Sequence, residues 1–134
     1  MKKMNNKGFS LVELIIVIAI MAILAAALAP QLIKYLEESR ESTDQQACDT
    51  IKSCFNAAMT NENAYKAVTG GTVSSPLTFS TAANISTGST DLDDELTSSL
   101  AALEAPKATG KSNYEIQWTV SANGEITGLT VTTV

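Results

Sequence analysis

Histidine is absent from the 134 residues of this chain, and cysteine occurs only twice. Histidine is the commonest general base and metal ligand, so its absence argues against an enzyme and against a metal or cofactor site. Cys48 and Cys54 would lie about 9 Å apart along one helix, beyond the ~7 Å reach of a disulfide. We therefore expect two free, half-buried thiols and no disulfide in the carboxyl-terminal region, where cysteine does not occur.

Basic residues are also few. Nine lysines and arginines stand against 14 acidic residues, for a formal charge of −5. This balance argues against general nucleic-acid binding, which requires a basic face. Three of the nine cations, Lys2, Lys3 and Lys7, are concentrated ahead of the main apolar segment.

That apolar segment runs unbroken from Leu14 to Ala29 and is followed by Pro30. About 20 residues at roughly 1.5 Å per residue cross a bilayer as a helix, and the preceding lysines favour a cytoplasmic amino terminus. Glu13 stands at its start, although a charge at membrane depth costs on the order of 2.5–3.5 kcal/mol. A plain single-pass anchor leaves this acid unexplained. A secretory signal with cleavage after Ala29 is disfavoured by the length of the run and by Pro30.

Residues 1 to about 40 resemble the type IV prepilins and their pseudopilin relatives. The similarity is carried by a short charged leader ending in Gly8, the aromatic Phe9, the carboxylate of Glu13 and the apolar run to Pro30. The resemblance implies that a prepilin peptidase cleaves between Gly8 and Phe9 and methylates the new amino group of Phe9. It also implies three parts: a leader (1–8), a transmembrane and filament-core helix (9–30), and an extracytoplasmic globular head (31–134).

The resemblance further implies a filament built from copies of this chain. Pairing of Glu13 with the Phe9 amine of a neighbour would compensate two costly charges and fix the axial register, while Pro30 would kink or loosen the helix. The implied partners are other pilin subunits, the peptidase, an inner-membrane assembly platform and the cytoplasmic membrane before assembly. The expected product is an extracellular pilus, with adhesion or twitching motility as properties of the polymer. A pseudopilin of a type II secretion or competence DNA-uptake system is the alternative.

Beyond Pro30 the helical pattern continues as an amphipathic stripe. Its apolar positions recur at helical spacing and form a single stripe: Ala47, Cys48, Ile51, Cys54, Phe55, Ala58 and Met59. This spacing predicts one long helix from Phe9 to about Thr60. Its second half would dock the head. A stop signal follows at Thr69-Gly70-Gly71, with Tyr65 and Val68 in a last turn or in a separate short one.

The head is predicted to hold a second helix, with leucines at 92, 96, 100 and 103 on one face behind an acidic first turn, and a short strand near 77–80. Residues 114–121 alternate in polarity, and Asn123-Gly124 predicts a two-residue type I′ hairpin turn. That turn sets Trp118 opposite Leu129 and Ile116 opposite Val131. The fold class is therefore α+β, a long amino-terminal helix on a small antiparallel sheet. The predicted head core comprises Ile51, Phe55, Ile116, Trp118, Leu129 and Val131.

Overall fold

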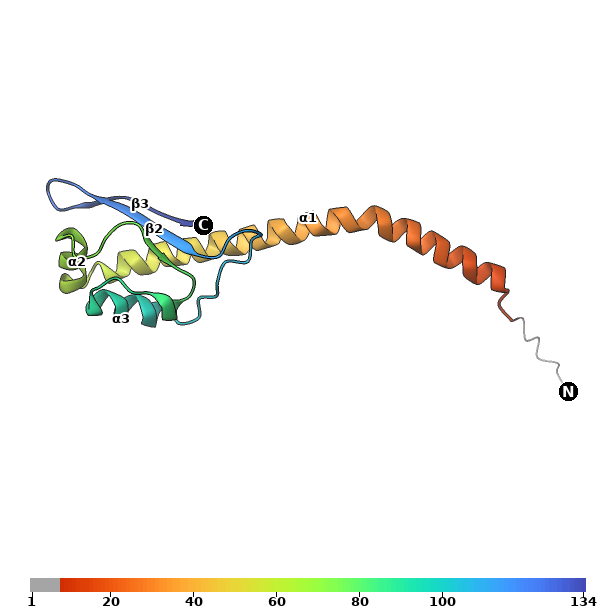
Figure 1. Ribbon diagram of the computed structural model, residues 1–134, viewed down its shortest axis with the longest axis horizontal. Helices are drawn as coiled ribbons and strands as arrows, with labels where there is room; N and C mark the ends of the chain where they lie inside the picture. Colours follow the sequence, from red (N-terminus) through yellow and green to blue (C-terminus); the bar gives the residue numbers. More distant parts are fainter. Residues whose placement is uncertain (1–7) are drawn as a thin grey trace. The chain divides into compact units, whose positions relative to one another are not determined.

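The computed structural model describes residues 8–134. The chain divides into two compact units, one ending at Leu36 and one formed by Glu37–Val134. We call residues 8–36 the amino-terminal segment and residues 37–134 the head. Helix α1 (Leu11–Ala58), labelled in Figure 1, contributes residues to both units. The predicted helix from Phe9 to about Thr60 is confirmed, with each end two residues shorter.

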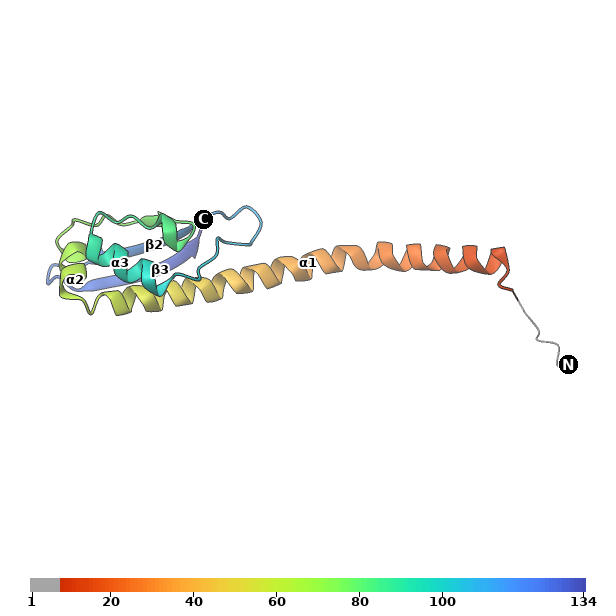
Figure 2. The same cartoon turned by 90° about the horizontal axis from the view of Figure 1, so that it is seen from below.

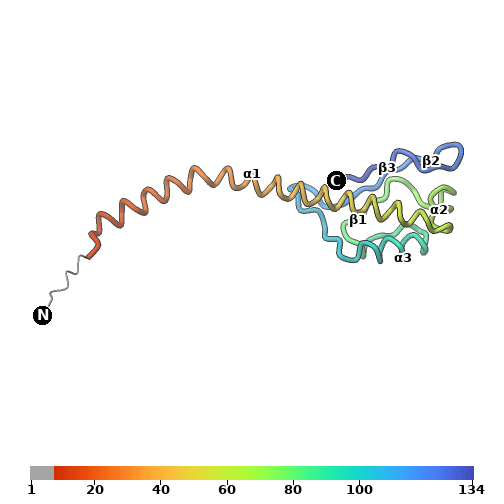
Figure 3. The backbone as a smooth tube through the Cα atoms, turned by 180° about the vertical axis from the view of Figure 1, so that it is seen from behind, coloured from red at the N-terminus to blue at the C-terminus, as the bar shows by residue number. Residues whose placement is uncertain are grey.

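Helix α1 is continuous through Pro30. Proline has no N–H to donate to the carbonyl four residues earlier, so one backbone hydrogen bond is missing at this turn. The helix nevertheless does not end there, and Figure 3 draws α1 as one helix. Every described side chain from Gly8 to Leu36 is exposed within this chain.

The carboxyl-terminal part of α1 buries the stripe that the sequence predicted. Cys48, Ile51, Phe55 and Ala58 are buried, and Ala47, Cys54 and Met59 are partly covered. Both cysteines are free thiols, as predicted. The stripe is therefore a packing surface for the head.

Two further helices complete the helical part of the head (Figure 2). Helix α2 (Glu62–Thr69) is a separate element, whose first turn is capped by Asn61: its side-chain oxygen accepts hydrogen bonds from the backbone N–H groups of Asn63 (3.0 Å) and Ala64 (3.4 Å). Helix α3 (Thr90–Ser99) follows a short 3₁₀ turn (Ala82–Asn84) and ends before Leu100 and Leu103, so it is shorter than the predicted leucine face. Leu92, Leu96 and Leu100 are buried, whereas Leu103 is only partly covered.

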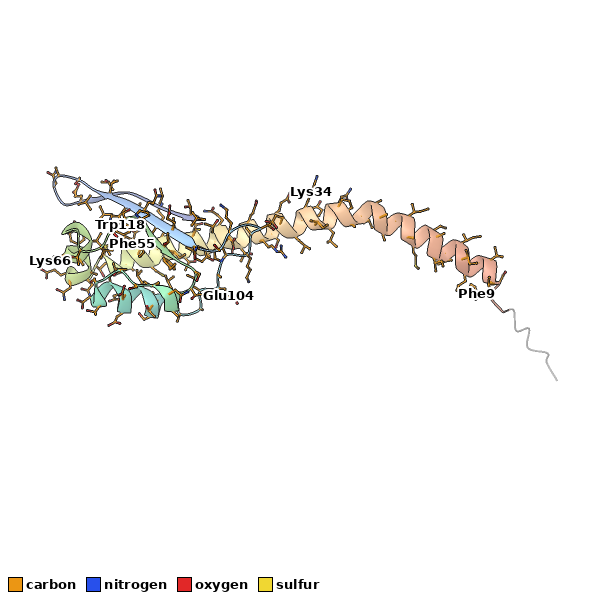
Figure 4. The ribbon with its side chains drawn as sticks, in the orientation of Figure 1. Phe9, Lys34, Phe55, Lys66, Glu104 and Trp118 are labelled. Atoms are coloured by element: carbon orange, nitrogen blue, oxygen red, sulfur yellow. The ribbon has the colours of Figure 1, made fainter. Side chains whose placement is uncertain are left out.

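Three antiparallel strands form the sheet, in the order β1 (Leu77–Phe79), β2 (Tyr114–Val120), β3 (Ile126–Thr133). In the central strand, Ile116 pairs with Leu77 on one side and with Val131 on the other. The sheet meets α1 through the rings of Phe55 and Trp118, whose centroids are 5.2 Å apart and which are labelled in Figure 4. The chain thus has the α+β architecture of the pilin fold.

The predicted two-residue turn at Asn123-Gly124 is wrong. Ser121 N–H donates to the Glu125 carbonyl at 2.8 Å, so the loop contains three residues, and only Gly124 has a positive φ, +82°. Three-residue hairpin loops combine a type I turn with a left-handed glycine, whereas a type I′ turn would need a positive φ at Asn123 as well. The asparagine-glycine signal therefore located the hairpin but not its loop length.

A second glycine corrects the resulting register. Relative to a two-residue loop, the three-residue loop shifts the pairing of β2 with β3 by one residue near the turn. A β-bulge between Gln117 and Thr119 restores the predicted register in the rest of the two strands. Gly128, with φ +63°, supplies the extra residue. The predicted pair of Ile116 with Val131 is therefore confirmed, but Trp118 faces the bulge and forms no regular pair with Leu129.

Candidate processing and assembly site

The predicted cleavage position lies just ahead of helix α1. Gly8, Phe9 and Ser10 are non-helical and exposed, and Phe9 retains 89% of its surface. Figure 4 shows Phe9 at the beginning of the helix. No neighbouring atom lies within 4 Å of a side chain built on Gly8. The bond between Gly8 and Phe9 is consequently part of exposed, non-helical backbone, whereas the three leader lysines lie outside the described residues.

Glu13 forms a hydrogen bond that the sequence analysis missed. Its Oε2 accepts the backbone N–H of Ser10 at 2.8 Å, and Leu14 N–H bonds to the Ser10 carbonyl at 3.2 Å. Ser10 therefore occupies the N-cap position, and Ser10-x-x-Glu13 forms one half of a capping box. This four-residue signature was present in the sequence. The Glu13 carboxylate accepts the Ser10 N–H, which has no acceptor within the helix, and it lies at the positive end of the helix dipole.

The rest of the amino-terminal segment presents a continuous apolar surface. Helix α1 contains an 18-residue window of mean hydropathy 3.0, none of it buried, which by length and composition is sufficient to cross a membrane. Large apolar side chains between Leu11 and Leu36 are about half exposed or more. A patch of this extent on one chain marks a surface that lipid or another protein covers.

One comparison with known proteins covers the residues of this site. Residues 3–29 match the family described as the prokaryotic N-terminal methylation motif. This motif is the leader signature of type IV prepilins and pseudopilins, and it covers the predicted cleavage position, Glu13 and the apolar run up to Ala29. No curated protein and no solved structure matches the chain. The amino-terminal segment is thus of the type IV prepilin or pseudopilin kind and fits a membrane-anchored precursor.

The predicted head-core residues are brought together in the structure, but not to equal depth. Ile51, Phe55, Ile116 and Trp118 are buried, while Leu129 and Val131 on β3 are only partly covered. Both partly covered residues belong to an edge strand. Tyr114, the α3 residues Leu92 and Leu96, and Leu100 directly after α3 complete the core, although the predicted head core did not include them.

Two carboxylates of α1 that sequence reasoning overlooked bind the backbone of the segment Pro106–Gly110. Asp44, only 3% exposed, accepts the N–H of Lys107 with both oxygens (2.8 and 3.0 Å) and the N–H of Ala108 at 2.8 Å. Glu37 accepts the N–H and the hydroxyl of Thr109 at 2.6 and 2.8 Å. Neither contact has a sequence signal, because each joins residues more than 60 positions apart through a loop of no regular pattern.

The hydrogen bonds and the burial at these contacts shift the pKa of three nearby side chains. The Thr109 N–H, followed by its hydroxyl, lowers the pKa of Glu37. Burial, with the nearby Asp44 carboxylate as a second cause, raises the pKa of Tyr114 to about 12, and the Tyr114 hydroxyl donates to the Glu104 carbonyl at 3.0 Å. Burial likewise raises the pKa of the Cys48 thiol. Cys48 is therefore kept in its neutral, unreactive form.

Asp44 lines two open cavities of about 300 and 350 Å³. The first is mostly apolar and is lined by α1 and the residues following α3; the second is lined by α1, Thr109 and the end of β3. Across residues 8–134, no group of three potential metal ligands comes together. The features with a clear chemical consequence are therefore the processing junction, Glu13 and the apolar helix face.

Proposed function

We propose that this chain is the structural subunit of an extracellular type IV pilus. Prepilin peptidase cleaves it between Gly8 and Phe9 and methylates the amino group of Phe9. The processed chain leaves the cytoplasmic membrane at an assembly platform and polymerises through the apolar face of α1. It has no enzymatic activity of its own, and adhesion and twitching motility are properties of the filament.

The observation that carries this proposal is the combination of an exposed Gly8–Phe9 junction with an unburied apolar helix whose first turn carries Glu13. A bilayer covers such a helix in the precursor, and the helices of neighbouring copies cover it in a polymer. Pairing of Glu13 with the amine of a neighbouring Phe9 replaces two isolated charges in an apolar environment by one compensated pair. The pair also selects a single axial register, as buried polar groups do in helical bundles.

A pair of variants at Glu13 tests this role. Glu13→Gln keeps an oxygen that can accept the Ser10 N–H but removes the charge, whereas Glu13→Ala removes both. We expect both variants to insert in the membrane and to be cleaved, and both to yield few filaments, as measured by shearing filaments from cells and quantifying the chain. Normal filament yield from Glu13→Gln would contradict charge pairing.

Mass spectrometry of the surface-exposed protein tests the processing step. We expect an amino-terminal N-methyl-phenylalanine at position 9, and a chain beginning at Pro30 or still carrying residues 1–8 would refute it. Electron microscopy with an antibody to the head distinguishes the alternative. Long decorated surface filaments support a pilus subunit, whereas a processed chain without such filaments supports a pseudopilin of a secretion or DNA-uptake system.

A further inference from the structure

The smaller of the two cavities beside Asp44 combines an apolar wall with negative charge, and we call it the acidic cavity. Asp44, only 3% exposed, and the exposed Glu104, labelled in Figure 4, both line it. Lys107 is the one cation among its lining residues, so two carboxylates against one ammonium leave a formal charge of −1. The apolar wall consists of Ala47, Leu100, Ala102, Leu103 and Ala105.

Both carboxylates of the acidic cavity keep acceptor sites that the described part of the chain does not use. Asp44 accepts two N–H groups on Oδ2 and one on Oδ1. A carboxylate has about four lone-pair sites, so one site remains on Oδ1. Glu104 Oε2 contacts Lys107 Nζ at 2.6 Å, and Oε1 has no hydrogen bond within residues 8–134. The cavity therefore suits a cation on an apolar stem, which is the chemistry of a lysine side chain.

The cations of this protein differ in whether they already have a partner. Within the described residues, four of them form an ion pair or a hydrogen bond: Arg40, Lys66, Lys107 and Lys111. Lys34 and Lys52 form neither in this part of the chain. These two lysines are thus the candidates for a contact outside the chain.

Assembly would affect these two lysines differently. Lys34 follows Leu32 and Ile33, whose side chains are 61% and 68% exposed, and it projects from α1 in Figure 4. Neighbouring copies cover such apolar side chains in a filament, so Lys34 loses water there and requires a counter-charge. Lys52 belongs to the head, outside the apolar segment. Lys34 is therefore the better match for the acidic cavity.

We propose that, in the filament of the proposed function on which this inference rests, Lys34 of one copy enters the acidic cavity of a neighbouring copy. Its methylene stem lies along the apolar wall, and its ammonium group binds the open acceptor sites of Asp44 and Glu104. The lysine and the cavity are two different surfaces, so every copy donates one lysine and receives another. A contact of this heterologous kind repeats along an open polymer instead of closing into a dimer.

Charge reversal tests this contact. Lys34→Glu brings a carboxylate to the acidic cavity, and Glu104→Lys gives the cavity a positive charge. We expect each single variant to lower the yield of sheared filaments by at least about threefold. The double variant places opposite charges together again in every contact, and its yield should return to within about twofold of that of the unchanged protein. Lys52→Glu is the matched control, an exposed lysine on the same helix, and should leave the yield unchanged.

The outcome of this experiment is separate from that of the proposed function. Normal filament yield from Lys34→Glu would overturn the contact and leave the pilus subunit in place. A double variant that assembles no better than the two single variants would do the same. Absence of filaments from the unchanged protein would overturn the proposed function, and this contact with it.

Oxidative cross-linking of filaments gives a second measurement that does not depend on yield. Lys34→Cys combined with Ala102→Cys should form a ladder of disulfide-linked oligomers, because each chain contributes both sides of the contact. Lys52→Cys combined with Ala102→Cys is the control and should form none. The unchanged protein, which carries only the two native thiols, measures the background. A first pair that cross-links no more than the control pair would overturn the proposal.

Discussion

The strongest stability prediction concerns Asp44→Asn. Asp44 accepts three hydrogen bonds of 2.8–3.0 Å from two backbone N–H groups while 97% of its surface is removed from water. An asparagine has the same shape but presents an NH₂ group where one of these donors points. At least one N–H then loses its acceptor in a site that water does not readily enter.

The magnitude follows from the nature of these bonds. A hydrogen bond to a charged group contributes about 1.5–3 kcal/mol, and an unsatisfied buried donor costs about 1–3 kcal/mol. Because the two Lys107 contacts share one donor, the contributions do not add fully. We expect the free energy of unfolding of the head to fall by about 2–4 kcal/mol. In a domain of about 100 residues this lowers the Tm by roughly 10–30 °C.

Thermal unfolding of the full chain in detergent, followed by circular dichroism, measures this change. Asp49→Asn is the matched control, because Asp49 is exposed on the same helix and has no side-chain hydrogen bond within the described part of the chain. It should change the Tm by no more than about 2 °C, since exposed substitutions of this kind lie within roughly 0.5 kcal/mol. A Tm for Asp44→Asn equal to that of Asp49→Asn would refute the reasoning.

Two further predictions concern the bulge and acid pH. Gly128→Ala places a side chain at φ +63° and 3.2 Å from Thr119 Oγ1, so we expect a loss of about 1–2 kcal/mol in urea unfolding; an unchanged midpoint would show that the bulge relaxes. The pKa of Glu37 is lowered in the folded chain, so its contribution to stability is complete above the unfolded pKa, near 4.5, and is lost as the pH falls through the lower folded value. The Tm of Glu37→Ala should therefore decline less between pH 5 and pH 3 than that of the unchanged protein, and parallel declines would contradict this assignment.

Elements with a local periodic signal were predictable from the sequence. The stripe from Ala47 to Met59 and the alternation of residues 114–120 each repeat at the period of their element, so burial follows from spacing alone. The hairpin was located for the same reason. Its loop length was not, because asparagine-glycine occurs in both two- and three-residue loops and the outcome depended on a bulge four residues further on.

The contacts of Asp44 and Glu37 with the backbone of residues 107–109 had no comparable signal. Asp44 stands on α1 between polar residues, where an exposed acid is the ordinary expectation. Its burial results from the loop Pro106–Gly110 folding over it, a contact of high sequence separation between a side chain and backbone groups. Backbone donors carry no residue identity, and thus no pattern in residues 107–109 could have indicated their acceptor. Only the three-dimensional structure brings the two together.

The capping contact of Glu13 bears on how one carboxylate serves both the precursor and the polymer. An ionised carboxylate has about four lone-pair sites on two oxygens, and Ser10 N–H uses one of them, on Oε2. Pairing with an amine therefore does not require the cap to open. The cap also restricts the rotamers of Glu13 before assembly, which reduces the conformational entropy that pairing has to offset. Glu13→Asp keeps the charge, but its shorter side chain reaches both the Ser10 N–H and a neighbouring amine less well. We therefore expect this variant to give a lower filament yield than the unchanged protein. A normal filament yield would show that the charge alone is sufficient.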